Sequence, residues 1–68
     1  MVNTQKVAAK INKEWTPNFK AEVTETEGVS VKENGEQVLA CDNKGRVSFV
    51  KDGYETESAQ FEYEINHA

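Results

Sequence analysis

Few side chains in this chain of 68 residues could do chemistry. Cys41 and His67 are its only soft metal ligands, and their separation matches no metal-site spacing. His67 is the only histidine and lies next to the C-terminus, where order is usually poor, so no base is positioned to activate a nucleophile. No cation is placed to activate Cys41, so we interpret it as a packing residue within an apolar run.

Paired carboxylates are the other chemical feature. Glu55 and Glu57, and then Glu62 and Glu64, would share a face if the last segment were a strand. Such pairs can serve acid–base catalysis or hard-metal binding, but exposed acids on an edge strand also protect against aggregation. No glycine pair has the spacing of a phosphate-binding loop. We therefore predict that the protein is not an enzyme and holds no metal or cofactor.

Charge and size limit the remaining functions. The net charge is −4, and residues 53–68 contain four glutamates without any lysine or arginine. This acidic end argues against general nucleic-acid binding, which needs several cations on one surface. No apolar run approaches the roughly 20 residues of a membrane span, and the first residues lack the apolar stretch of a signal peptide, so we predict a cytoplasmic protein.

A chain this small needs support beyond its own core. One cysteine excludes an intrachain disulfide, and a core of this size supplies only about 3–5 kcal/mol. Oligomerisation or a protein partner is therefore the expected source of further stability. The simplest version is a homodimer, because two-fold oligomers are the commonest.

The first segment has the 3.6-residue period of an amphipathic helix. Its apolar residues that fall on one arc are Val7, Ala8, Ile11 and Trp15. The lysines on the other side are interpreted as a solvated face, with an anion or membrane contact as the alternative. Asn3 or Thr4 can cap the first turn, and Pro17 disfavours helix at the residue before it. We therefore predict a helix over about residues 3–15.

From Phe19 onward the period is two, which is typical of half-buried strands. Turn signals separate the apolar runs in "ETEG", "ENGE", "DNKG" and "KDGY", each with a glycine placed to adopt positive φ. The predicted strands are 19–25, 29–33, 36–42, 46–51 and 54–65, the last with a break near 58–60. Alternatively, Ser58 caps a short helix with Phe61 and Ile65 on one face. The predicted fold class is α+β, a single domain over 1–68 with an N-terminal helix packed on a four- to five-stranded antiparallel meander.

The turn types also predict how the strands pair, because loop type sets which residues face each other. A two-residue turn at Asn34-Gly35 places Val31 opposite Val38, and neighbouring turns extend this pairing into one apolar row that faces the helix. The row consists of Val23, Val31, Val38 and Val50. The same register sends four apolar side chains to the opposite face, which should be polar if it faced water. With Tyr54 beside the last turn, they form a predicted partner-binding patch of Leu39, Cys41, Val47, Phe49 and Tyr54.

The leading hypothesis is thus a small non-enzymatic protein-interaction domain. The alternative for the patch is that Phe61, Tyr63 and Ile65 fold back and cover it. Small acidic domains without catalytic residues are also of the kind that phages and mobile elements carry to bind a host factor, and a target of that sort cannot be named from the sequence.

One stretch, "GEQVLACDNKGRVSFVKDG", resembles the strand–turn–strand core of small SH3-like barrels such as Tudor domains. The likeness is carried by Gly35, Val38, Leu39, Ala40, Gly45 and Val47. It covers less than a third of the chain. The resemblance implies, as the alternative function, a small module that binds peptide or nucleic acid. Nucleic-acid binding would then weaken with salt and involve Lys6, Lys10 and Lys13.

Overall fold

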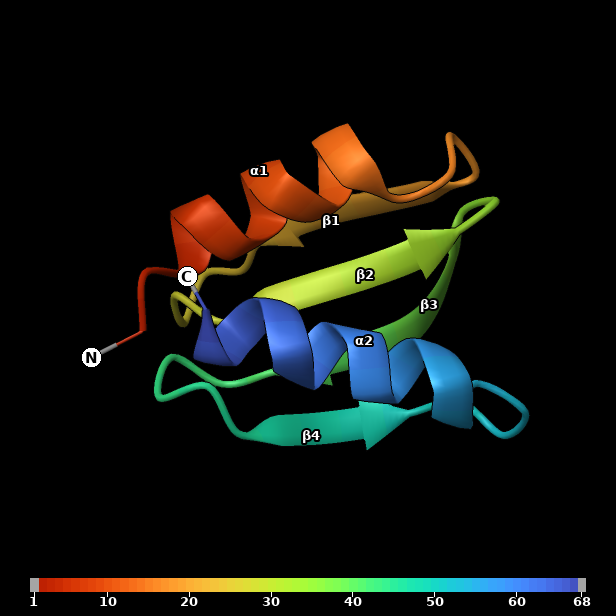
Figure 1. Cartoon of the computed structure of the whole chain (residues 1–68). Coiled ribbons are helices and arrows are strands. Elements are labelled where there is room, and N and C mark those ends of the chain that lie inside the picture. The colour runs from red at the N-terminus through yellow and green to blue at the C-terminus, as the bar shows by residue number, and fades with distance from the viewer. Residues whose placement is uncertain (1, 68) are drawn as a thin grey trace.

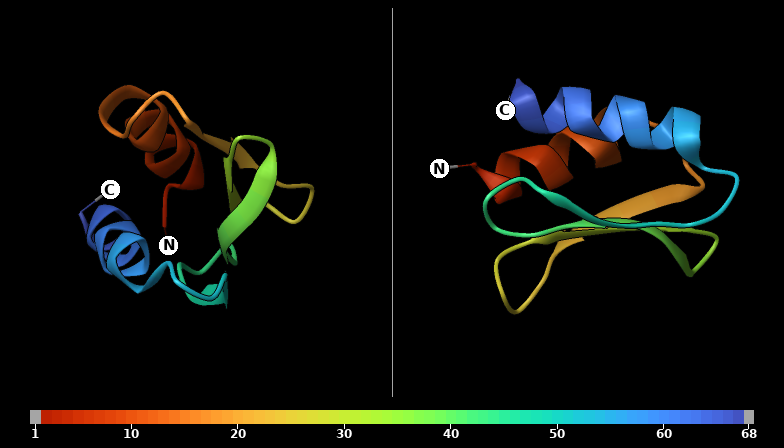
Figure 2. Two further views of the ribbon diagram at one scale, coloured as in Figure 1. Left: turned by 90° about the vertical axis from the view of Figure 1, so that its right-hand side faces the viewer. Right: turned by 90° about the horizontal axis from the view of Figure 1, so that it is seen from below.

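The chain folds into an antiparallel sheet with two helices on the same side. The computed structural model describes residues 2–67. Along the chain the elements are α1 (Thr4–Glu14), β1 (Phe19–Val23), β2 (Val29–Glu33), β3 (Glu36–Cys41), β4 (Val47–Val50) and α2 (Glu55–Asn66). The strand order is β1-β2-β3-β4, with α1 lying beside β1 and α2 on the side of β3 and β4 (Figures 1 and 2). The α+β class with an N-terminal helix on an antiparallel meander is therefore confirmed.

α1 forms where the sequence supplies a cap, an apolar stripe and a stop. The Asn3 side-chain oxygen accepts a hydrogen bond from the Lys6 backbone N–H at 3.1 Å, which satisfies one free donor of the first turn. Val7 and Ile11 are buried against the sheet. At Trp15 the backbone becomes extended, two residues before Pro17.

The predicted fifth strand over 54–65 is wrong, because Glu55–Asn66 is the helix α2. The helix also starts earlier than the alternative capped by Ser58, since the Ser58 N–H already donates to the Tyr54 carbonyl at 2.8 Å. Phe61 and Ile65, four residues apart, are both buried, whereas the intervening Tyr63 is exposed. Phe61 and Ile65 therefore form an apolar stripe on one face of the helix, and Tyr63 between them only made the sequence look like an alternating strand.

The sheet pairs differently from the predicted register. Val31 lies opposite Leu39 rather than Val38, because a bulge shifts the β2–β3 pairing between Val31 and Lys32. One extra residue in a strand sends every later side chain to the other face. Leu39 therefore faces the helices, and Val38, the bulged residue, is buried as well. β1 is also displaced, with Ala21 opposite Val31.

Gly28 allows the turn between β1 and β2 to pass close to the end of β3. A Cβ atom at position 28 would overlap the Cys41 carbonyl oxygen, so any other residue would force the two segments apart. The positive φ of this turn, 65°, belongs to Glu27 rather than to the glycine. At the next turn, Asn34 and Gly35 have φ of 53° and 87°, the two positive values that a type I′ hairpin requires.

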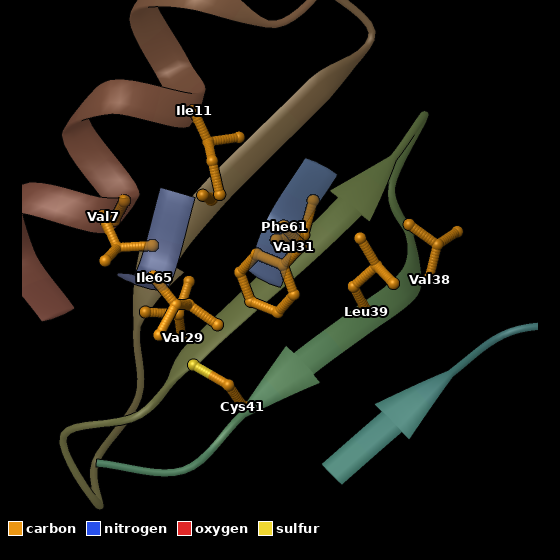
Figure 3. Close-up of a cluster of buried hydrophobic side chains, with 11 residues drawn as sticks. Val7, Ile11, Val29, Val31, Val38, Leu39, Cys41, Phe61 and Ile65 are labelled. Carbon is orange, nitrogen blue, oxygen red and sulfur yellow. The ribbon is translucent and has the colours of Figure 1, made fainter. Parts of the chain in front are cut away.

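The core lies between the sheet and both helices. Its buried apolar side chains are Val7, Ala8, Ile11, Ala21, Val29, Val31, Val38, Leu39, Cys41, Phe61 and Ile65 (Figure 3). No element of residues 2–67 covers the other face of the sheet (Figure 2). Within that part of the chain β1 and β4 are the two edges of an open sheet, so the closed barrel implied by the SH3-like resemblance is not formed.

Candidate functional site

The five residues of the predicted patch do not lie together on an open surface. Leu39 and Cys41 are buried in the core on the helix side of the sheet, so their predicted place on the opposite face is wrong. Val47 and Tyr54 are half-buried and pack against the same core. Phe49 is the exposed member, with 44% of its surface accessible, and it points to the face that the helices leave open.

Two features explain the difference. The bulge at Val38 turns Leu39 and Cys41 inward, and Phe61 and Ile65 of α2 share the core cluster with them (Figure 3). The covering residues are thus two of those named in the alternative above, although they cover the patch from a helix. The sequence signal for the bulge is the run from Val38 to Cys41, which is apolar throughout and does not alternate.

The β1 edge of the sheet is covered. α1 lies along β1 (Figure 1). The Asn12 side chain pairs with the backbone of Ala21 in both directions. Its Oδ1 accepts from the Ala21 N–H at 2.8 Å, and its Nδ2 donates to the Ala21 carbonyl at 2.9 Å. Asn12 therefore occupies the place that a further strand would take. Sequence reasoning missed this role, because an amide on the flank of an amphipathic helix is normally solvated.

The β4 edge is open. Within residues 2–67, no side chain or backbone group from another element bonds to the outer edge of Val47–Val50. One row of paired residues crosses the whole sheet, from Ala21 through Val31 and Leu39 to Val50. The accessible fraction along this row is 7% at Ala21, zero at the two central residues and 38% at Val50. Val50 on one face and Phe49 on the other therefore leave the β4 edge with exposed apolar side chains.

Three titratable groups have pKa values shifted by their surroundings. Burial raises the pKa of the Cys41 thiol, which makes it a poor nucleophile. The Tyr54 hydroxyl donates a hydrogen bond to Glu33, which raises the pKa of that tyrosine. Backbone N–H groups of Arg46 and Lys44 donate to Asp42 and lower its pKa, which stabilises the turn before β4.

No metal or basic site emerges from the remaining groups. His67 stacks on the Tyr63 ring with centroids 4.1 Å apart. Among residues 2–67, no three histidine, cysteine, aspartate or glutamate side chains are grouped so that they could hold a metal ion. The predicted basic face of α1 is divided, since Lys6 and Lys13 are exposed whereas Lys10 reaches toward Glu64.

No helix in the described part of the chain is long and apolar enough to cross a membrane. Two surfaces are the functional candidates: the open strand edge at β4 and a groove between the two helices. Comparison of the chain with protein-family models, with curated proteins and with solved structures gave no match.

Proposed function

We propose that the protein is a non-enzymatic protein-interaction domain that binds at the β4 edge, where a strand of a partner extends the sheet. The observation that supports this is the contrast between the β1 edge, which Asn12 occupies, and the β4 edge, which is open. In strand addition, the free N–H and C=O groups of the edge provide affinity and the neighbouring side chains provide specificity. Phe49 and Val50 are the specificity contacts of this proposal.

A second copy of the chain is the first partner to consider. Two β4 strands related by a two-fold axis present the same edge to each other, which is the simplest closed arrangement. Full burial of a valine or phenylalanine side chain is worth about 1.5–3 kcal/mol. Phe49 and Val50 have 44% and 38% of their surfaces left to bury, so complete burial of both in two copies would add about 2–5 kcal/mol, comparable to the roughly 3–5 kcal/mol expected from a core of this size.

The experiment compares two substitutions of the same chemistry at the two edges. Val50 and Val23 are exposed to nearly the same extent, 38% and 37%, but Val50 lies on β4 and Val23 on β1. A lysine on an edge strand blocks further pairing. In sedimentation at tens of micromolar and above, we expect wild type and Val23→Lys to associate and Val50→Lys to be monomeric.

Two results would contradict the self-association. One is a wild-type chain that stays monomeric across that range and sediments identically to Phe49→Lys. The other is an equal loss of association in Val23→Lys and Val50→Lys, which would place the contact away from β4. Unfolding curves of both variants exclude a loss that comes from misfolding.

A further inference from the structure

A groove separates the end of α1 from the first half of α2, on the helix side of the molecule and away from the open face of the sheet. It has a volume of about 390 Å³. The lining residues that matter here are Glu14, Trp15, Phe19, Glu57, Gln60 and Glu64. Three of them are carboxylates, two are aromatic, and no lysine, arginine or histidine lines the groove.

Glu64 is the unusual member of this group, because only 1% of its side chain is accessible. Its Oε2 accepts hydrogen bonds from Trp15 Nε1 at 3.3 Å and from Gln60 Nε2 at 3.2 Å, and both donors also line the groove. Its Oε1 is buried and has no hydrogen-bond donor among residues 2–67. The Lys10 ammonium forms an ion pair with Oε1 across 3.7 Å, a separation too long for a hydrogen bond.

A buried carboxylate oxygen without a hydrogen-bond donor is costly even beside a cation, since this oxygen has lost the hydrogen bonds that water would supply. An ionised carboxylate can accept about four hydrogen bonds, and Glu64 receives two. It therefore has unused acceptor capacity beside the groove that it lines. Glu14, which is exposed, and Glu57, which is half-buried, add further negative charge to the groove.

The wall of the groove is aromatic. Trp15 and Phe19 pack edge to face, with centroids 5.2 Å apart and an interplanar angle of 85°. A cation over the face of an aromatic ring is attracted by its π electrons, and tryptophan is the best such partner. Aromatic faces beside carboxylates suit a guanidinium group, which is planar, stacks on rings and donates several hydrogen bonds in a fixed fork.

We propose that this groove binds a guanidinium group, which stacks against Trp15 and donates hydrogen bonds to the carboxylates of Glu64 and Glu57. The group is either an arginine side chain of a polypeptide or a small guanidino compound. This assignment does not depend on strand addition at β4, because none of the lining residues belongs to that strand.

The single tryptophan makes the test direct, since Trp15 fluorescence reports on this groove alone. The full chain is titrated with N-acetyl-arginine amide, with the isosteric but neutral N-acetyl-citrulline amide, and with N-acetyl-lysine amide. We expect saturable binding of the arginine probe, with a dissociation constant of about 1 mM for so small a ligand. The citrulline probe should bind at least tenfold more weakly, and the lysine probe several-fold more weakly.

Butylguanidine, a monocation that carries the guanidinium without a peptide backbone, distinguishes the two sources. Binding as tight as that of the capped arginine assigns the site to the guanidinium alone, and tighter binding of the capped arginine assigns it to a polypeptide. Either result supports the proposal. An unsaturable arginine titration, or equal affinity for the citrulline or lysine probe, overturns it.

Variants on α2 provide the matched control. Glu57→Gln removes a charge from the groove and should weaken arginine binding several-fold, whereas Glu62→Gln makes the same change on the same helix outside the groove and should leave it unaltered. Equal effects of the two would reduce the binding to general charge attraction and overturn the site. Glu64→Gln should weaken binding more than Glu57→Gln. Because Glu64 also bonds Trp15, a folding check by circular dichroism accompanies that variant, and Glu57→Gln carries the test if it unfolds.

Discussion

The two edges of the sheet show how differently one small protein can treat equivalent positions. β1 and β4 are both outermost strands, and each has one neighbour. At β1 a single asparagine, Asn12, pairs with the exposed backbone of Ala21 and takes the place of a further strand. At β4 nothing in residues 2–67 does so. An open edge in a molecule that has closed the other one is a reasonable binding surface.

β4 nevertheless has features that restrict uncontrolled pairing. It is only four residues long, and its pairing with β3 shifts between Ala40 and Cys41. Arg46 and Lys51 stand immediately before and after it. Short length, a bulge and flanking charge are the usual protections of an edge strand. They favour a defined partner over indiscriminate aggregation.

The largest expected effect concerns the strand that supports the open edge. Leu39 of β3 is fully buried and lies opposite Val50 of β4. Leu39→Ala should lower the free energy of unfolding by about 2–5 kcal/mol, measured by urea denaturation, because it leaves a cavity beneath both helices. The control is Val23→Ala on β1, away from the proposed contact at β4, which should cost less than about 1 kcal/mol. Similar costs for the two would mean that Leu39 does not face the core and that the bulge is absent.

An intermediate effect is expected at the covered edge. Asn12→Ala removes both hydrogen bonds to Ala21 and should cost about 1–3 kcal/mol in unfolding free energy. It should also increase self-association, since both edges are then open. Lys13→Ala, at the next and exposed position of α1, is the control and should change neither quantity. If Asn12→Ala left association unaltered, coverage of β1 would not be what distinguishes the two edges.

The smallest effect is a shift in a titration near β4. The loop after this strand is held by the Tyr54 hydroxyl, which donates to Glu33 and raises the tyrosine pKa above its ordinary value of 10.0. The stabilisation from this bond is present below pH 10 and is lost as the pH rises through the folded-state pKa. In a Tyr63→Phe background, where Tyr54 is the only tyrosine, Glu33→Gln should lower the midpoint of the tyrosinate absorbance titration. An unchanged midpoint would remove Glu33 as the cause.

The parts of the fold that depend on local sequence could be predicted. The cap at Asn3, the stripe of Val7 and Ile11 and the stop before Pro17 lie within one segment, and α1 follows from them. The Asn34-Gly35 turn likewise has its expected positive φ values.

The parts that depend on distant residues could not be predicted. Phe61, Tyr63 and Ile65 fit a strand as well as a helix, and α2 meets α1 through Glu64 and Trp15, which are 49 residues apart. A bulge likewise depends on how two strands meet, so Leu39 and Cys41 were expected on the wrong face.

The candidate sites divide in the same way. Phe49 could be identified from its position in an alternating run, and it is exposed as expected. The cover over β1 and the groove around Glu64 each require a side chain from one segment to meet another that is remote in sequence. Neither Asn12 nor Glu64 differs from a solvated polar residue until that meeting is seen.

The pairing of Asn12 with Ala21 has a consequence for what happens if the chain is cut. A protease that removed α1 would remove in one step both the apolar side chains that pack on the sheet and the Asn12 amide that pairs with the outer edge of β1. The remaining sheet would then have two open edges, at β1 and at β4, in place of one. If β4 pairs with a second copy as proposed, a unit with two open edges can add copies in both directions, so cleavage between Glu14 and Phe19 should convert a closed dimer into growing fibres.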